Sequence, residues 1–595
     1  MTYTKPGVYI TQKLEEVNAA VPEVTDFIPG IIGVPISVYE GSLEQAASLE
    51  TTGSTVDLEV SLPNFKGSFL PIANSIKVYV SRYGVAPQVN HLTQKWFRDK
   101  GLPEPTTDIA YYEVKASAID TTDITNGKIK VSITGETDLT AINGADYFNF
   151  STGKYSVYVE YAAIVQSSFS TTETFTLTAN QREINLQHYP VTAVASVMHN
   201  ETTLTADDPT DGYTINEVSG AITLGSSLTI SDDDTLVVVY SYENPLFTSP
   251  QRISSIDELE AMVGDIHPYN ALGFAAYLAL TKAGSGPIYI MGVPPAANDL
   301  NNAFVPDSTE FSNALSKFGD IEVYTIVGIG DIGDIGAAVQ QHVSAYSQPS
   351  ESKFRIAMLG YKDFASASAN LGTDRQAALN DLLATVYNYE DRRIRILLNP
   401  EIYVAYNGID YPVPGVYYSA IYAGLKKTLS EAPSTPLTRY AENMVTGVRW
   451  PNGLPNYFTE SELDNLAAAG YWILDQVGST VRVRHQMTTA ETYVETREDS
   501  IVTGIDWLSV TIKDVLDKHV GGANITRAYL ESIFMAINAV IEKAKTINAC
   551  GPNTKLVSLV QNANSPDTID VVLDYDPLYP SNVIRITIKS PVRNA

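Results

Sequence analysis

The stretch Gly328-Ile-Gly-Asp-Ile-Gly333 has the spacing of a dinucleotide-binding loop. It follows an expected strand over 321–327 and opens an expected helix over 332–346, whose N-terminus could hold a pyrophosphate. Asp331 and Asp334 would place negative charge beside the phosphates, and the acidic residue for the ribose comes about 30 positions on instead of about 20. We favour a glycine-rich turn with an Asp-capped helix, and a nucleotide-dependent oxidoreductase is the alternative.

Other residue types that commonly carry chemistry form no recognisable constellation. The sequence has neither the GxxxxGK[ST] pattern nor the GxSxG pattern, and its seven histidines lack metal-site spacing. The single Cys550 excludes an intrachain disulfide framework and a thiolate zinc site. The acids of Asp207-Asp208 and Asp232–Asp234 are interpreted as solvated turn residues, and the basic run Arg392–Arg395 as a packed or interface feature. We expect no enzymatic activity, no cofactor and no metal.

The composition limits the partners and the number of domains. A chain of 595 residues suggests about four domains, and its 44% of hydrophobic residues allow large cores. The net charge of −29 argues against a nucleic-acid partner and against an anionic membrane surface. No apolar run reaches the ~18 residues of a membrane-spanning helix, so we expect no membrane insertion, and no signal peptide is expected either.

From about residue 246, apolar strands alternate with helices, which predicts a parallel or mixed sheet covered on both faces. Ser255–Glu258 and Thr459–Glu462 read as capping boxes, and Gly470 stands where a helix C-terminal cap is expected. Small residues such as Gly424 permit close helix packing. The expected strands are 288–291, 321–327, 355–359, 394–398 and 480–484, and the expected helices are 270–282, 332–346, 375–388, 416–429, 498–517 and 525–547.

Residues 46–245 have a different character. They are rich in Thr, Val, Tyr and Asp, with short alternating runs and frequent turns, which predicts all-β modules. One short helix is expected at 91–100. Two successive modules share an order of strand, glycine turn, strand and Val/Tyr-rich final strand, so a duplication is one interpretation. A β-rich receptor-binding or adhesive virion protein that uses these modules is a further alternative function.

Both ends of the chain contain strand-like runs. Val8–Ile10 follow a Pro-Gly pair, and period-two alternation marks residues 569–575 and 583–589. Pro577 and Pro580 favour an extended connection between the last two runs. The final run is therefore either the second strand of a hairpin or an arm that joins another sheet.

An ordered set of short motifs runs along the chain on both sides of the β-rich segment. It comprises Lys5–Ile10, Ile253–Gly264, Gly284–Ile290, Ala423-Gly424 with Pro436–Thr438 and Gly447, Leu466–Gly470, Val481–Arg484, Thr488-Thr489, Ile569–Leu573 and Val583–Ile588. As a set, these motifs resemble the tail sheath proteins of contractile phage tails and related injection machines. The resemblance covers about residues 1–40 and 246–595, and residues 46–245 fall outside it.

The resemblance implies an α/β and α+β multidomain fold, in which an α/β sheath core carries inserted all-β domains and extended terminal strand arms. The expected parts are an N-terminal arm (1–24), an α/β sheath domain (25–45 plus 246–415), inserted β domains (46–165 and 166–245), a C-terminal sheath core domain (416–576) and a C-terminal arm (577–595).

The implied function is structural. Copies of the chain would assemble with one another as stacked hexameric rings around an inner tail tube protein, and contraction would drive the tube through a target envelope. Baseplate and tail terminator proteins are further implied partners, in the virion tail sheath and, during assembly, in the host cytoplasm. The helix over 525–547, with Lys543 and Lys545, is a candidate tube-facing element. The arms would join the sheets of neighbouring subunits through Val8, Tyr9, Ile10, Val583, Ile584, Arg585, Ile586 and Ile588.

Overall fold

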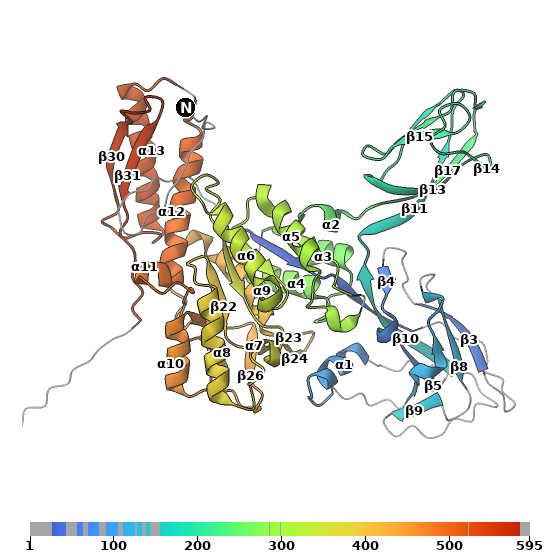
Figure 1. Cartoon of the computed structure of the whole chain (residues 1–595), viewed down its shortest axis with the longest axis horizontal. Coiled ribbons are helices and arrows are strands. Elements are labelled where there is room, and N and C mark those ends of the chain that lie inside the picture. Colours follow the sequence, from blue (N-terminus) through green and yellow to red (C-terminus); the bar gives the residue numbers. More distant parts are fainter. Residues whose placement is uncertain are drawn as a thin grey trace, which may run out of the picture. The chain divides into compact units, whose positions relative to one another are not determined.

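The computed structural model describes residues 27–42, 56–62, 69–82, 91–104, 111–124, 128–133, 138–142 and 155–582, apart from residues 285, 298 and 522. The chain has an α/β multidomain fold, whose helices and strands are shown in Figure 1. It divides into two compact units. Unit 1 comprises residues 1–31, 278–289 and 318–595, and unit 2 comprises residues 32–277 and 290–317.

Unit 1 is built on parallel strands that are buried on both faces. β20 (Thr325–Gly328), β21 (Ile356–Leu359), β22 (Ile394–Leu397) and β27 (Tyr471–Trp472) pair in this order, and every residue in them is buried. β1 (Pro29–Gly33) is the neighbour of β20 on the other side. Such continuous apolar strands need a cover on each face.

The helices that connect these strands begin at side-chain caps. α6 (Ile332–Tyr346) and α8 (Arg375–Asn388) follow β20 and β21, and both confirm the expected limits. The helices α9 (Tyr418–Thr428) and α10 (Glu460–Ala469) also lie where the sequence predicts them. Thr459 and Glu462 make the reciprocal bonds of a capping box.

The strand expected at 321–327 is too long, because only its end enters the sheet. Residues Phe318–Asp320 form a 3-10 turn, and the Arg355 guanidinium binds carbonyl oxygens in this turn and directly after it. Its Nη2 donates to the oxygens of Phe318 and Ile321 over 2.9 and 2.8 Å. The Ile321 oxygen also accepts from the amide of Val323, so both of its lone pairs are used within this turn and none is left for a neighbouring strand.

The C-terminal part of unit 1 contains two long helices and a hairpin. α12 (Asp499–Asp517) packs against α13 (Arg527–Thr546), and the hairpin of β30 (Lys555–Gln561) and β31 (Ile569–Asp574) packs against α13 through β30. Two three-stranded sheets complete the unit. Their strands are β23 (Glu401–Tyr406), β24 (Ile409–Pro414) and β26 (Val445–Arg449) in one, and β25 (Ala441–Glu442), β28 (Leu474–Val477) and β29 (Thr480–Val483) in the other.

Unit 2 begins with a β-rich module that includes α1 (His91–Asp99). β2 (Ile36–Ser42) lies within residues that we assign to the α/β domain from the sequence, yet it pairs with β10 of this module. The larger sheet holds β2, β10 (Tyr155–Val165), β5 (Lys77–Arg82), β6 (Tyr111–Val114) and β9 (Leu139–Ile142), with β4 (Phe69–Pro71) beside β10. The smaller sheet holds β3 (Val56–Ser61), β8 (Lys128–Ile133) and β7 (Ile119–Asp120).

A second β-rich module follows, and its two sheets enclose an apolar core centred on residues such as Val197, Ile222 and Val238. One sheet holds β11 (Ser168–Thr176), β17 (Thr235–Glu243), β13 (Val191–His199) and β14 (Thr202–Thr203), and the other holds β12 (Glu183–Asn185), β16 (Ala221–Leu224) and β15 (Tyr213–Asn216). Both modules confirm the all-β prediction for this segment.

After these modules the chain returns to helices. Ser255 caps α3 (Ile256–Val263) by accepting from the amide of Glu258, as predicted, while the Glu258 carboxylate accepts from the amide of Ser254 instead of that of the capping residue. The remaining elements are α2 (Pro245–Thr248), β18 (Gln251–Ile253), α4 (Ala271–Ala283), β19 (Ile288–Gly292) and α5 (Ser308–Lys317).

Candidate assembly site at the C-terminal hairpin

The hairpin of β30 and β31 is a two-stranded sheet with apolar side chains on its surface. Its register runs from the Lys555–Asp574 pair to the Gln561–Ile569 pair, and in the described ranges each strand pairs only with the other. Leu573 is buried, whereas Val557 and Val560 are 55% and 51% exposed. An apolar strand with an unpaired edge is a template on which a further strand can add.

The alternating run at 569–575 predicts β31, but its partner strand is not among the expected strands. The partner is β30, at residues 555–561, whereas the hairpin alternative from the sequence would pair β31 with residues 583–589. Residues 583–589 lie outside the described residues. The sequence pattern does not reveal β30 as a strand, because a bulge between Leu556 and Ser558 interrupts the regular alternation of its side chains.

Acidic side chains lie along β31 and at its start. Asp567 and Asp570 are exposed, and Asp574 is half-buried. Asn562 Nδ2 donates to Asp570 over 2.7 Å, and Lys555 Nζ lies 3.6 Å from Asp574. The hairpin therefore offers two strand edges with carboxylates beside them.

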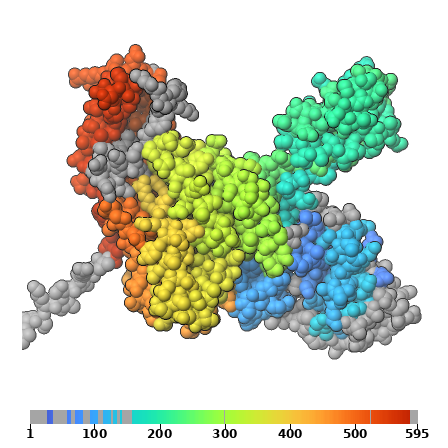
Figure 2. Space-filling model, viewed as in Figure 1, coloured from blue at the N-terminus to red at the C-terminus, as the bar shows by residue number. Residues whose placement is uncertain are grey.

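α13 covers β30 with one face and presents the other at the surface of unit 1 (Figure 2, in orange and red). Ile533, Ile537 and Ile541 are buried, while Phe534 and Met535 are 47% and 68% exposed. The two lysines of the candidate tube-facing helix differ. Lys543 is exposed, and Lys545 is half-buried and donates to Glu542 over 2.8 Å.

The chain leaves the hairpin through a strap, which we define as residues 575–582. Its first two residues form an inner anchor. Tyr575 Oη donates to the Ala549 oxygen over 3.0 Å, and the amide of Gly551 donates to the Asp576 oxygen over 2.6 Å. The Asp576 amide donates to Thr554 Oγ1 over 3.0 Å. The strap thereby closes the open end of the hairpin.

The end of the strap forms an outer anchor. Tyr579 Oη donates to the carboxylate of Glu495 in α11 (Val494–Arg497). Asn582 Nδ2 donates to Glu498 Oε1 over 2.7 Å and lies 3.0 Å from His485 Nε2. The strap contains no helix, which confirms the extended connection expected from Pro577 and Pro580 as far as residue 582.

Beneath the strap, a buried network of charges joins α12 to β22 and α9. Asp499 accepts from Arg395 Nε over 2.7 Å and lies 2.5 Å from Lys426 Nζ. Burial alone would raise the pKa of Asp499, but the charges of Lys426 and Arg395 outweigh it, so this pKa lies below its usual value. Arg393 forms a second pair with Asp506. Arg393 and Arg395 are buried in these ion pairs, which confirms for both residues the prediction that the basic run is a packed feature.

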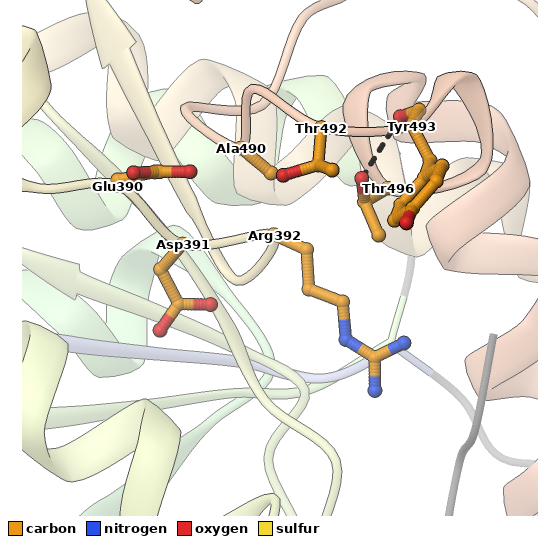
Figure 3. A pocket seen from close by; sticks show the side chains of 7 residues that line it. All are labelled: Glu390, Asp391, Arg392, Ala490, Thr492, Tyr493 and Thr496. Atoms are coloured by element: carbon orange, nitrogen blue, oxygen red, sulfur yellow. Dashed lines mark hydrogen bonds between the residues drawn. The ribbon is translucent and has the colours of Figure 1, made fainter. Parts of the chain in front are cut away.

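Arg392, the first residue of the basic run, lines a surface pocket of about 300 Å³ (Figure 3). Figure 3 shows Thr496, from α11, donating to the carbonyl oxygen of Tyr493, a bond of 2.8 Å. Burial and the neighbouring Arg393 lower the pKa of Arg392 to about 10. The lining combines two carboxylates, two threonine hydroxyls, a tyrosine and the Arg392 guanidinium. Its residues are Glu390, Asp391, Arg392, Ala490, Thr492, Tyr493 and Thr496.

The Gly328–Gly333 loop contains a buried carboxylate, that of Asp331. Asp331 is buried and caps α6, accepting from the amide of Gly333 over 2.9 Å and from the amide of Lys362 over 3.1 Å. This confirms the interpretation as an Asp-capped turn. The carboxylate occupies the helix N-terminus where a nucleotide phosphate would bind, so the geometry opposes the oxidoreductase alternative.

The eight residues expected in the strand arms lie outside the described residues. They are Val8, Tyr9, Ile10, Val583, Ile584, Arg585, Ile586 and Ile588. In the part of the chain that the structure describes, no three His, Cys, Asp or Glu side chains form a group that could hold a metal ion. None of the helices described there is long and apolar enough to cross a membrane.

Comparison with known proteins gives one curated relative and several similar structures, while no protein-family model matches the chain. The tail sheath protein of Mycobacterium phage Bxz1 is 25% identical over 369 residues, which is 60% of this chain and 58% of that protein. The match thus spans little more than half of the relative's length. It supports the contractile tail sheath family that the ordered motifs resemble.

The similar structures are sheath proteins with low sequence identity. The contracted helical sheath of the anti-feeding prophage has a TM-score of 0.44 and 13% identity, covering 59% of this chain and 90% of its own. The contracted sheath of the extracellular contractile injection system PVC has a TM-score of 0.42 and 12% identity. The match covers 58% of this chain and 87% of the PVC chain. The sheath tail protein of Desulfitobacterium hafniense has a TM-score of 0.36 and 10% identity. The match covers 96% of this chain and 100% of that protein's chain.

Proposed function

We propose that this chain, a relative of a phage tail sheath protein, is a structural rather than catalytic subunit of a contractile sheath. Its copies assemble as stacked hexameric rings around an inner tube, and contraction drives the tube through the target envelope. Baseplate and tail terminator proteins meet the ends of the stack, in the tail of a virion or a related injection system after assembly in the host cytoplasm. The open two-stranded hairpin is the single observation that carries the proposal.

In this proposal, the hairpin accepts an arm from a second copy of the chain. β30 and β31 pair only with each other within the described ranges, and the alternating run at 583–589 begins immediately after the strap. Main-chain hydrogen bonds along a free edge give affinity, while alternate side chains give register. Each copy has both an acceptor hairpin and a C-terminal arm, so addition is head-to-tail and continues from copy to copy.

The charges of the two proposed partners are complementary. The arm carries Arg585 and Lys589 on the face opposite its isoleucines, and the hairpin carries Asp567 and Asp570 on its surface. Because the chain has a net charge of −29, a local basic segment is attracted to the acidic surface of another copy. Pairs of this kind fix register and partner choice more than they add affinity.

The exposed face of α13 is the proposed contact with the tube. Met535, Ala539 and Lys543 are exposed and follow one another at intervals of four residues. This row lies on the side of the helix opposite the buried Ile533 and Ile537. Lys543 is the exposed charge at its end, whereas Lys545 is already bound to Glu542.

A pair of neighbouring substitutions in the arm tests the assembly proposal. Ile586→Asp places a charge on the apolar face of the alternating run, whereas Thr587→Asp places the same charge on the opposite face. The purified full-length chain is expected to form rings or tubes in negative-stain micrographs. We expect Ile586→Asp to raise the protein concentration needed for sedimentable polymer at least tenfold, while Thr587→Asp stays within about twofold of the unmodified chain.

Circular dichroism and thermal melting of both variants serve as the folding control. If the unmodified chain gives no polymer alone, the assay is repeated with the inner tube protein that the proposal requires. Polymer formation by Ile586→Asp at the unmodified concentration would show that residues 583–589 do not bind a neighbour. Absence of polymer under both conditions would reject the sheath function itself.

A further inference from the structure

We propose that the outer anchor of the strap is a releasable latch that gives the C-terminal arm two lengths. With the latch closed, the arm leaves the subunit after Asn582. With the latch open, it leaves after Asp576, because the inner anchor stays in place. This inference deepens the proposed function, since the use of a longer arm rests on the arm joining a neighbouring subunit.

The inner anchor is packed too tightly to open easily. A Cβ atom added to Gly551 would lie 2.3 Å from Asp576 Oδ2, and one added to Gly504 would lie 2.9 Å from Tyr575 Oη. A main-chain hydrogen bond joins Gly551 to Asp576, and the Tyr575 hydroxyl donates to the oxygen of the buried Ala549. Opening this anchor would leave the amide of the buried Gly551 without its partner, which is costly, and would remove the Tyr575 bond from the buried Ala549 oxygen.

The outer anchor lacks these features. Tyr579 is 58% exposed although its hydroxyl binds Glu495. Its ring therefore gives up little buried area when it leaves. The two prolines of the strap, Pro577 and Pro580, donate no amide hydrogen bond to the rest of the subunit. The polar contacts at this end of the strap are three side-chain contacts, one of Tyr579 with Glu495 and two of Asn582 with Glu498 and His485.

Asn582 itself favours a reversible contact. Its Oδ1 is buried and has no hydrogen-bond partner among the described residues, while its Nδ2 binds Glu498. Release returns Oδ1 to water and recovers its hydration, which offsets the loss of the Nδ2 bond. The Glu498 carboxylate keeps two other partners after release. His485 Nε2 lies 2.8 Å from its Oε1, and Gln486 Nε2 donates to its Oε2 over 3.2 Å.

Opening the latch lengthens the arm considerably, and the hydrogen bonds that it breaks are those of the Tyr579 and Asn582 side chains. It frees residues 577–582, and an extended chain spans at most about 3.3–3.6 Å per residue, so the six residues add up to about 20 Å of reach. A neighbour that holds residues 583–589 could then move by this distance without releasing its strand. The latch thus lets subunits separate while their strand pairing persists.

A spin-label distance measurement on the full-length chain tests the latch. In a Cys550→Ala background, labels are placed at Ser581 on the strap and at Thr546 on α13, both of which are exposed. We expect one narrow distance distribution for this labelled chain. Adding Tyr579→Phe and Asn582→Ala is expected to broaden the distribution at least twofold and extend it by up to about 20 Å.

The melting temperatures of the variants show whether the outer anchor is a releasable latch or a contact that the fold needs for its stability. The melting temperature of the double variant should stay within about 2 °C of the labelled background, whereas Gly551→Ala, at the inner anchor, should lower it by more than about 4 °C. An unchanged narrow distribution in the double variant, or a drop in melting temperature equal to that of Gly551→Ala, would overturn the proposal.

The same variants separate this inference from the proposed function. A broad distribution with unchanged stability supports the latch as a property of the single subunit. If no variant and no unmodified chain forms polymer with or without tube protein, the sheath function is rejected while the two strap lengths still stand. Narrow distributions in polymer-forming variants would reject the latch and leave the sheath function intact.

Discussion

Two buried histidines are held as neutral rings, one in each unit. The Tyr269 amide donates to His267 Nδ1 over 3.2 Å, so the ring proton is on Nε2, which lies 3.3 Å from Thr93 Oγ1. Burial lowers the pKa of His267 to about 3. His342 Nε2 lies 2.6 Å from the Arg355 guanidinium, and burial together with that charge lowers its pKa to about 3 as well. Neither ring accepts a proton without disturbing its neighbours.

These low pKa values make the fold sensitive to acid. The unfolded pKa of histidine is about 6.5, so protonation below this value favours the unfolded chain, and the destabilisation grows until the folded pKa of about 3. At pH 5 we expect unit 2 to lose about 2 kcal/mol through His267 relative to pH 7. His267→Gln should remove this loss. Hydrogen exchange of peptides covering residues 91–100 and 263–270, at both pH values, measures it.

The matched control for this substitution is His188→Gln, because His188 is exposed. The control should retain the acid sensitivity of the unmodified chain. Equal acid sensitivity in His267→Gln and the unmodified chain would show that the ring at 267 is not the group that takes up the proton.

At the scale of elements, α12 is held by charge as well as by apolar packing. Asp499 lies at its start and Asp506 two turns later, and both are buried. They bind Arg395 and Arg393, which lie on or beside β22, and Lys426 of α9. Tyr422 and Tyr324 donate to the same two carboxylates over 2.7 and 3.0 Å. This network sets how the helix sits on the sheet.

Removing one partner from this network should be strongly destabilising. Asp499→Asn leaves Arg395 and Lys426 buried without their counter-charge, which typically costs about 3–5 kcal/mol. The control is Glu460→Gln, which removes an exposed carboxylate from Arg484, a residue that keeps Asp464 and Asp475. Such exposed pairs contribute about 0–1 kcal/mol. Urea unfolding of unit 1 should separate the two variants clearly, and equal midpoints would contradict a stabilising role for the network.

Local signals in the sequence predict much of the fold. The helices α6, α8 and α10 begin and end where their caps and periodic residues indicate, and Gly470 adopts φ 115° at the end of α10. The close approach expected at Gly424 is also confirmed, because a Cβ there would lie 2.4 Å from the Ala279 oxygen. In each case the decisive interaction lies within a few residues or depends on the size of one side chain.

The candidate site depends on interactions that the sequence does not reveal. Tyr579 and Asn582 each bind a glutamate 84 residues earlier, so no local pattern connects them. β30 has a bulge that breaks its alternation, and the strand at 321–327 is shortened by an arginine more than 30 positions away. Distant partners and irregular pairing are set by the tertiary fold.

At the scale of the whole molecule, the net charge of −29 opposes contact between copies. Screening is stronger at high salt, since the Debye length falls from about 10 Å at 0.1 M to about 3 Å at 1 M. For the proposed sheath, we expect the concentration needed for assembly to fall severalfold between 0.05 and 0.5 M sodium chloride. Sedimentation across this range measures it. A rise with salt would instead show that pairs such as those of Arg585 and Lys589 dominate assembly.

The inner anchor determines where mechanical load enters the subunit. Once the latch is open, a pull on residue 582 would act to unzip β30 from β31 at the Lys555–Asp574 pair, because this is the open end of the hairpin. The bonds of Tyr575 and Asp576 to Ala549, Gly551 and Thr554 lie across that opening. Ala549 in turn donates to the Ala544 oxygen in α13 over 2.8 Å. Force therefore passes from the strap into the helix, and the hairpin ladder stays outside the load path with its edges available.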